Sequence, residues 1–415
     1  MAGKKDAEVK DKEKGKTKEK KEEKKKEKEK KPPTRLERLG GIVKSVNDKF
    51  GVNTLMVGYK NFYVGTRVST GSILMDLATG GGIPIGRVVQ FHGKESSGKT
   101  SNAIRVAGNL QKLCTKCYTP INGIIDPVTL KPISEVCKCG VQRRGMVVFV
   151  DVEGTFDPDW AECLGLLIDP EFFIYCRPES GEESIDIVEA LIRSGDIDMI
   201  IYDSIAAFAP LEEMKKSAEE NTVGLGARLL NRAWRVWGSA MSDAANKNGV
   251  APTVITINQQ RLKIGVMYGS PITRPGGEGQ KFANSIEIDM KRATEDKTKD
   301  EDGNFLPLVT FAGKVTKNKT ARPFLEYEFQ VATEAFQYKN IRYNKGDIAE
   351  LKTLRDLAYR YGIMGKDESS KKYFYKKHKF DRQMDLFDKV LYTNAGIIAL
   401  KQDILEVMRH GKVSA

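Results

Sequence analysis

The stretch GGIPIGRVVQFHGKESSGKT, residues 81–100, decides the fold of this chain. Its apolar part, VVQFH at 88–92, has the length and composition of a buried strand, and its last eight residues fit the pattern G-x-x-x-x-G-K-T in full. A helical pattern, SNAIRVAGNLQKL at 101–113, follows at once. In such a strand–loop–helix unit, glycines let backbone N–H groups wrap phosphates, and the helix N-terminus adds a positive dipole end. The stretch therefore predicts a nucleotide site.

The residues of this loop have distinct expected roles. Lys99 should reach the β- and γ-phosphates, and the hydroxyl of Thr100 should ligate Mg²⁺, so ATP and Mg²⁺ are the expected cofactors. The residues expected to contact the nucleotide are Gly93, Glu95, Ser96, Ser97, Gly98, Lys99, Thr100 and Ser101.

Further apolar runs of strand length follow along the chain, with helical patterns between them. They lie at residues 146–151, 172–176, 199–203 and 253–258. Strands that alternate with helices indicate a mostly parallel sheet with helices on its faces. We predict an α/β protein with a P-loop core, a mostly parallel central sheet and a small C-terminal α+β domain.

Two of these strands lead to carboxylates. The run MIIYD at 199–203 would leave Asp203 at the carboxyl edge of the sheet, where an Asp can hold the Mg²⁺ shell; the alternative is an Asp that caps a helix. The strand at 146–151 runs on to Glu153, which could orient an attacking water or simply face solvent. Spacing alone leaves both roles of Glu153 open.

Four of the six cysteines form two close pairs inside an insertion at 114–142. Two thiolate pairs suit a tetrahedral Zn²⁺ site, although C-x-C is one residue shorter than the usual knuckle. Two disulfides or four free thiols are the alternatives. The insertion is poor in large apolar residues, so a bound metal would supply folding energy. We predict structural zinc beyond the end of the P-loop helix, away from the phosphates, with the ligands Cys114, Cys117, Cys137 and Cys139.

Composition and charge exclude several classes of protein. The 415 residues include 68 Lys and Arg against 56 Asp and Glu, a net charge of +12. No apolar run approaches the roughly 18 residues of a membrane span, and the Lys- and Glu-rich start has no apolar core of a secretory signal. Six cysteines are too few for a disulfide scaffold. The two outside the insertion, Cys163 and Cys176, are expected to be buried small hydrophobes.

The ends of the chain differ from its centre. Residues 1–33 form a Lys- and Glu-rich tail that we predict to be disordered, acting either as a mobile polycation or as a solubilising tail. An amphipathic helix is expected at 34–52, and further helices near 348–361 and 397–409. Basic and aromatic residues alternate at 371–380, which suits nucleic-acid binding or an exposed amphipathic strand.

Taken in order, the motifs resemble the RecA family of DNA recombinases. The resemblance covers about residues 35–333 in colinear order, through 81–100, VDVEGTFDPDWAECLG at 150–165, IIYDSIAAFAP at 200–210, INQQRLKIGVMYGSPITRPGGEGQKFANS at 257–285 and KVTKNKTARPF at 314–324. It implies an ATP-dependent recombinase that forms a helical filament on single-stranded DNA, pairs it with homologous duplex and exchanges strands, with DNA-dependent ATP hydrolysis. A hexameric helicase motor and a non-catalytic DNA-binding filament protein are the alternatives.

The resemblance also implies roles for matching residues at the nucleotide. Glu153 would activate the water, and Gln259 would sense the γ-phosphate. Lys317 and Lys319 would reach the ATP of a neighbouring subunit and act in catalysis there. The adenine would contact Asp157 and Trp160, the latter in place of the family's usual tyrosine, and Phe282 would lie at the subunit interface.

The DNA-binding residues are implied in the same way. Residues 261–277 resemble the family's second DNA loop, with Ile264 as a wedge between bases, and residues 213–226 resemble the first. Arg228, Arg232 and Arg235 follow on one helical face, which could instead be a solvated basic face. The expected DNA contacts are Arg228, Arg235, Arg261, Lys263, Ile264, Gly276 and Gly277.

The resemblance completes the expected organisation. The expected partners are single-stranded DNA, double-stranded DNA and further copies of the chain, and no membrane binding is expected. The expected location is the cytoplasm of a bacterial cell or of a phage-infected host. The expected parts are the tail 1–33, an oligomerisation segment 34–70, an ATPase core 71–333 with its zinc-binding insertion 114–142, and a duplex-binding C-terminal domain 334–415.

Overall fold

The computed structural model describes residues 34–50, 55, 65–122, 137–207, 209–214, 224–262, 272–273, 275, 277, 279–295, 298–300 and 302–410. The chain divides into two compact units, Met1–Lys60 and Asn61–Ala415. The first contains α2 (Arg35–Phe50). Thr34 opens this helix with a capping box: the Thr34 hydroxyl accepts the Glu37 N–H at 3.3 Å, and the Glu37 carboxylate accepts the Thr34 N–H at 2.6 Å. The helix expected at 34–52 is therefore confirmed.

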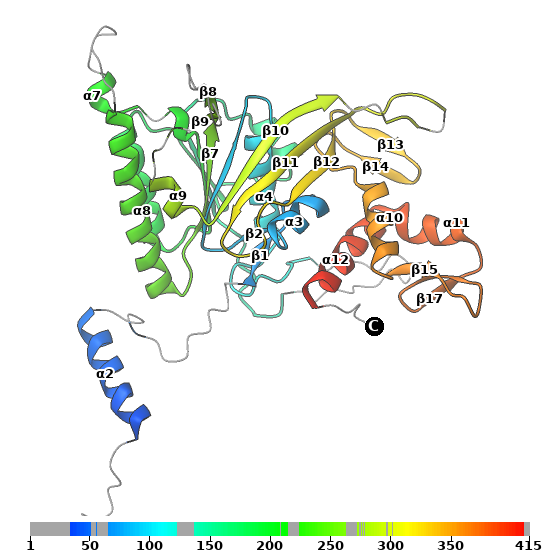
Figure 1. The fold of residues 1–415 in the computed structure, drawn as a ribbon, viewed down its shortest axis with the longest axis horizontal. Coiled ribbons are helices and arrows are strands. Elements are labelled where there is room, and N and C mark those ends of the chain that lie inside the picture. Colours follow the sequence, from blue (N-terminus) through cyan, green and yellow to red (C-terminus); the bar gives the residue numbers. More distant parts are fainter. Residues whose placement is uncertain are drawn as a thin grey trace, which may run out of the picture. The chain divides into compact units, whose positions relative to one another are not determined.

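An eight-stranded sheet forms the centre of the second unit, in the order β12-β11-β10-β3-β7-β6-β4-β5 (Figure 1). Every neighbouring pair from β10 to β5 is parallel, while β11 and β12 are antiparallel additions. The mostly parallel sheet is therefore confirmed, and the expected strands shift by at most one residue at either end. The strands are β3 (Val88–Gly93), β4 (Val147–Asp151), β5 (Phe173–Cys176), β6 (Met199–Asp203), β7 (Thr253–Gln259), β10 (Ile286–Glu295), β11 (Leu308–Asn318) and β12 (Glu326–Ala332).

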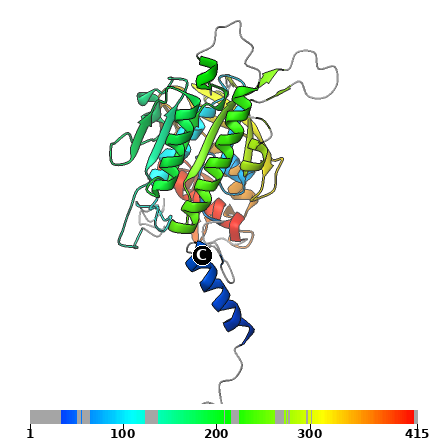
Figure 2. The same cartoon turned by 90° about the vertical axis from the view of Figure 1, so that its left-hand side faces the viewer.

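Helices cover both faces of the sheet, because successive strand residues point to opposite sides. On β4, Phe149 belongs to the core beneath α4, whereas Val148 and Val150 belong to the core beneath α6 and α8. Figure 2 looks toward the second face, with α8 in green. The covering helices are α3 (Ile73–Thr79), α4 (Lys99–Gln111), α5 (Pro158–Cys163), α6 (Gly181–Ser194), α8 (Leu225–Asn248) and the short α9 (Gly279–Ala283).

The C-terminal part packs around a separate hydrophobic cluster, drawn mainly from α10, α12 and the elements between them, to which Ile73 of α3 also belongs. Glu350 ties it to the sheet region, because its buried carboxylate accepts the Ile73 N–H at 2.9 Å and pairs with Lys401 at 3.1 Å. The predicted α+β character is confirmed. Its elements are α10 (Leu351–Arg360), β15 (Met364–Lys366), β16 (Tyr373–Tyr375), β17 (His378–Phe380), α11 (Gln383–Leu386), the π-helical turn Phe387–Leu391 and α12 (Asn394–His410).

Short elements complete the described chain. They are β1 (Arg67–Val68), β2 (Ile83–Pro84), the 3-10 turn Ile205–Ala207, α7 (Leu211–Met214), β8 (Arg261–Leu262), β9 (Ile272–Thr273), β13 (Phe336–Tyr338) and β14 (Ile341–Tyr343). None of the described helices combines the length and apolar character that crossing a membrane requires.

The burial predicted for the two isolated cysteines is wrong. Cys163 is exposed and Cys176 is only half-buried. Cys163 ends the six-residue helix α5, and Cys176 ends β5, the outermost strand of the sheet. Sequence pattern does not reveal that β5 is an edge strand, and an edge strand has one side without a neighbour.

Candidate functional site

The phosphate loop joins β3 to α4 at the carboxyl edge of the sheet, and tight packing shapes it. A Cβ atom on Gly93 would lie 2.2 Å from the carbonyl oxygen of Met290. Gly98 has φ +77°, and a Cβ there would lie 2.6 Å from the ring of Phe311. Both positions therefore require glycine.

Lys99 lies in the middle of this loop with its ammonium group turned inward. Its Nζ donates to the carbonyl oxygens of Lys94 at 2.7 Å and of Gly93 at 3.3 Å. Burial lowers the pKa of Lys99, while the charges of Asp203, Glu153 and Glu95 oppose that shift. The loop thus holds a cation at its centre. Phosphate oxygens can replace the two carbonyl oxygens as its hydrogen-bond acceptors.

The predicted Mg²⁺ ligands lie together. The Thr100 hydroxyl donates to Oδ2 of Asp203 at 2.6 Å. The pKa of Asp203 is raised to about 7, mainly by burial. The hydrogen bond from Thr100 opposes this rise, and the nearby carboxylates of Glu153 and Asp151 add to it. A buried carboxylate and a hydroxyl, beside further acidic groups, form an oxygen donor set that fits Mg²⁺.

Glu153 lies where the carboxyl ends of β4, β6 and β7 meet. Its Oε1 accepts hydrogen bonds from the Ser204 hydroxyl and, at 3.0 Å, from Nε2 of Gln259. The Glu153 side chain is exposed, so it faces solvent as well as these two partners, and its role in orienting water stays a prediction. From the sequence, Ser204 was considered only as part of a helix-capping pair with Asp203, and not as a partner of Glu153. Its place directly after Asp203 at the end of the same strand was the available signal.

Asp151 supports the turn that carries Glu153, and sequence reasoning also missed it. Its carboxylate accepts the backbone N–H groups of Gly154 at 2.7 Å and Phe156 at 3.0 Å. The hydroxyl of Tyr175 donates to the same carboxylate at 3.0 Å. A buried carboxylate that accepts several hydrogen bonds holds its turn firmly, so Asp151 fixes the backbone from which the Glu153 side chain projects.

The two residues expected at the adenine lie next to the P-loop helix. Asp157 caps α5 by accepting the Trp160 N–H at 3.1 Å, and the indole N–H of Trp160 donates to the Ser101 hydroxyl at 3.0 Å. Nζ of Lys345 lies 5.5 Å from the centre of the indole ring, a contact that the sequence did not suggest. Contact with adenine stays a prediction for both.

Lys317 and Lys319 lie at the end of β11 and just beyond it, near the start of β10 and away from the phosphate loop. Lys317 opposes Glu287 on β10, and Glu287 in turn opposes Gln90, three residues before Gly93 on β3. That is about 10 Å along the strand. Nζ of Lys319 donates to the carbonyl oxygen of Phe282 at 2.7 Å, and the side chain of Phe282 is 78% exposed. The pair is therefore placed away from the phosphate loop of its own chain.

The predicted DNA residues are only partly described. Arg228 and Arg235 are exposed on α8, with Arg232 beside them. Arg261 opens β8, which pairs with β9, and Gly277 has φ +62°. Lys263, Ile264 and Gly276 lie outside the described residues, as does most of the first predicted loop.

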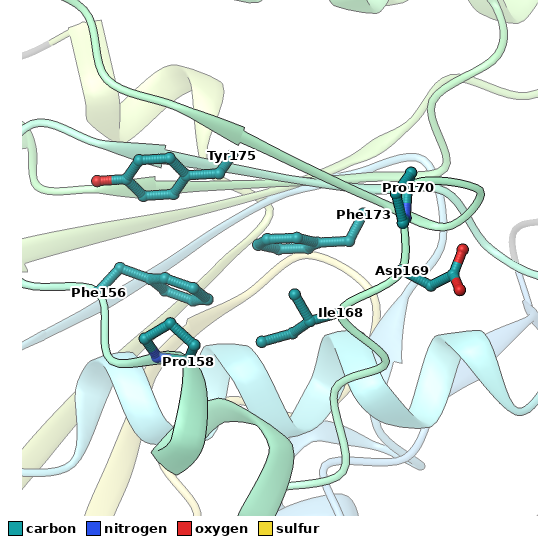
Figure 3. Close-up of a pocket in the computed structure, with 7 residues that line it drawn as sticks. All are labelled: Phe156, Pro158, Ile168, Asp169, Pro170, Phe173 and Tyr175. Carbon is teal, nitrogen blue, oxygen red and sulfur yellow. The ribbon is translucent and has the colours of Figure 1, made fainter.

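A pocket of about 460 Å³ lies beside β5 (Figure 3). The rings of Phe156 and Phe173 stack across it with centroids 5.5 Å apart. None of the predicted nucleotide or DNA residues lines it. Its walls are Phe156, Pro158, Ile168, Asp169, Pro170, Phe173 and Tyr175.

The four clustered cysteines converge at the far end of α4. Their sulfur atoms all lie within 4.8 Å of one another, and no disulfide joins them, so they could hold a metal ion. The sulfur–sulfur distances are 3.5 Å for Cys114 and Cys139, 3.6 Å for Cys117 and Cys137, and 3.2 Å for Cys137 and Cys139. A tetrahedral Zn–S₄ site requires about 3.8 Å between sulfur atoms, so these three pairs lie slightly closer than such a site requires.

Backbone hydrogen bonds prepare this cluster. The Tyr118 N–H donates to the Cys114 carbonyl at 2.6 Å, and the Cys114 N–H donates to the Thr119 carbonyl at 2.9 Å, which closes a tight turn. N–H groups of Gln142 and Val141 lower the pKa of Cys139 to about 6, which favours its thiolate. Since α4 has 13 residues, about 20 Å separates this cluster from Lys99.

Comparison with known proteins adds an independent line of evidence about the family of this chain. The family model of the RecA N-terminal domain matches residues 37–128 and 115–335. The protein named Protein RecA from Chlorobaculum tepidum is 36% identical over 337 residues, covering 80% of this chain and 82% of that protein. Protein RecA from Clostridium tetani is 34% identical over 330 residues, covering 79% and 81%. Protein RecA from Gluconobacter oxydans is 34% identical over 334 residues, covering 80% and 81%.

Proposed function

The chain belongs to the RecA family of DNA recombinases, and we propose that it hydrolyses ATP in response to DNA and couples hydrolysis to strand exchange. It is a recombinase by this membership, and the hexameric helicase alternative is not favoured. The observation that supports ATP hydrolysis best is the hydrogen bond from Gln259 to Glu153, since it joins the start of the DNA segment to the carboxylate beside the phosphate loop.

The proposed chemistry uses six side chains of this chain. Glu153 orients and polarises the water that attacks the γ-phosphate, and Ser204 and Gln259 hold its carboxylate in place. Lys99 exchanges its carbonyl partners for phosphate oxygens. When bound, Mg²⁺ neutralises charge on the β- and γ-phosphates, and Thr100 and Asp203 would hold it.

A filament would complete the site. Lys317 and Lys319 lie away from their own phosphate loop, which supports their action on the ATP of a neighbouring copy. We assign subunit contact to residues 34–70 and Phe282, the ATPase core to 71–333, and single-stranded DNA binding to α8 and the segment from Arg261. The C-terminal domain, 334–415, would bind duplex DNA through exposed lysines of the β16–β17 hairpin. We assign the protein to the cytoplasm.

The metal bound by the four cysteines is proposed to be structural zinc. The cluster offers four sulfur donors, Cys114, Cys117, Cys137 and Cys139, which is the donor set of a closed structural zinc site. Its distance from the phosphate loop supports a role in folding the insertion.

One pair of experiments tests the proposed function. ATP turnover of the full chain is measured with and without single-stranded DNA, and the same samples, with a slowly hydrolysed ATP analogue, are viewed by electron microscopy. We expect DNA to stimulate turnover and helical filaments to form. Turnover that ignores DNA, or closed rings in place of filaments, would reject the proposal.

A further inference from the structure

We infer that Gln260 is a positioning residue that anchors the start of the DNA-binding segment to the phosphate loop, and that this anchor makes ATP turnover respond to DNA. The role rests on the proposed DNA-dependent ATPase activity. Gln260 stands between Gln259, which contacts Glu153, and Arg261, which opens β8 above β7 (Figure 1).

The backbone of Gln260 is tied to the phosphate loop itself. Its N–H donates to the carbonyl oxygen of Gly93 at 3.2 Å. The same oxygen accepts a hydrogen bond from Nζ of Lys99 at 3.3 Å. The first residue after β7 and the lysine of the phosphate loop therefore share one acceptor.

The side chain of Gln260 is tied to two further strands. Its Nε2 lies 2.6 Å from Oδ1 of Asp289 on β10 and 3.1 Å from Nδ1 of His92 on β3. A primary amide has two N–H bonds, so it can donate to both when His92 carries its proton on Nε2. His92 and Asp289 oppose each other in the β3–β10 register, and the side chain of His92 is 4% exposed. The amide thus reaches one buried partner, His92, and one partly exposed partner, Asp289, whose side chain is 36% exposed. Its bond to the Asp289 carboxylate is of the stronger, charge-assisted kind.

This anchor fixes the direction of the neighbouring residue. The amide of Gln259 turns to Glu153, and the amide of Gln260 turns to His92 and Asp289, so the two side chains leave the chain toward different partners. When DNA draws the chain from Arg261 onward, the anchored Gln260 serves as a fixed pivot, so a rotation of the backbone on one side of it turns Gln259 on the other side. Without the anchor, the segment can follow DNA while Gln259 stays where it is.

The test compares substitutions in the full chain. Gln260→Met keeps the length of the side chain and removes both amide bonds, and Gln337→Met, at an exposed glutamine of β13, is the matched control. Asp289→Asn keeps an oxygen acceptor for the Gln260 amide, whereas Asp289→Leu removes it. For each protein, kcat and the KM for ATP are measured with and without single-stranded DNA.

We expect Gln260→Met and Asp289→Leu to lower the DNA-stimulated kcat roughly tenfold. Their KM for ATP and their DNA-free turnover should match Gln337→Met, and Asp289→Asn should keep most of the stimulation. Full stimulation in Gln260→Met would overturn the inference. So would an equal loss of DNA-free turnover, which would show that Gln260 supports the phosphate loop in general. If the unaltered chain shows no stimulation by DNA, the proposed function fails instead.

Discussion

The two ends of α4 are built in different ways. At its start, Lys99 lies in a loop shaped by distant parts of the sheet, including Met290 and Phe311. Just beyond its end, Cys114 lies in a tight turn formed by its sequence neighbours, and its thiol lies close to the other three thiols of the cluster. The first end is specified by tertiary packing, whereas the second brings together two pairs of thiols and depends on what they bind.

This difference predicts how each end responds to damage. Packed side chains hold the phosphate end, so removing one functional group should change its chemistry and leave its shape. The cysteine end has little apolar surface among its described residues, so removing its metal should change its shape. Four sets of substitutions test this contrast, and the set with the largest expected effect comes first.

Lys99→Ala should abolish ATP-dependent DNA binding, because the phosphates lose their central cation. Filter binding with and without ATP measures the effect, and circular dichroism should show an unchanged fold. Lys94→Ala, in the same loop but exposed, is the control and should behave as the unaltered chain. ATP turnover near the unaltered rate in Lys99→Ala would remove the phosphate site from this end of α4.

Glu153→Gln should lower ATP turnover about 10²- to 10⁴-fold while ATP and DNA still bind, because the amide keeps the shape but not the charge that polarises water. Long-lived filaments should accumulate. Single-turnover kinetics with nucleotide-binding assays separate the two effects, and Glu162→Gln on α5 is the control, an exposed glutamate of the same region. Unchanged turnover would mean that another group positions the water.

Lys317→Ala and Lys319→Ala test whether the phosphate end is complete within one chain. Each should lower DNA-stimulated turnover at least about tenfold without preventing nucleotide binding, because the missing cation belongs to the neighbour's site. Lys314→Ala, earlier on β11, is the control. Mixing Lys317→Ala with Glu153→Gln protein should restore part of the turnover. If mixtures give only the average of the two proteins, each site is complete within its own chain.

Replacing Cys114 and Cys117 by Ser should have the smallest effect on ATP. The protein should lose about one zinc per chain, and hydrogen exchange should rise around the insertion, while ATP affinity changes less than about threefold. Metal analysis and calorimetric titration measure both quantities, with the exposed Cys163→Ser as control. Native protein with no zinc and four titratable thiols would reject the site. Loss of ATP binding along with zinc would show that the two ends of α4 are not independent.

The sequence was informative where a pattern is local. The P-loop pattern, the apolar strands and the paired cysteines identified the fold, the phosphate loop and the cysteine cluster with few errors. The error at Cys176 arose because strand order is a non-local property, and no local pattern shows that β5 is an edge strand. Cys163 ends α5, where burial depends on which elements pack against that helix.

The sequence by itself determined which chemical groups are present and where strands and helices form, because spacing along the chain sets both. Only the tertiary structure decided which groups meet. Glu153 and Gln259 lie 106 residues apart in the chain and hydrogen-bond at 3.0 Å, since parallel strands bring their carboxyl ends to one edge. Asp151, Ser204 and Gln260 gain their places in the same way, and no local pattern distinguishes them from ordinary polar residues at strand ends.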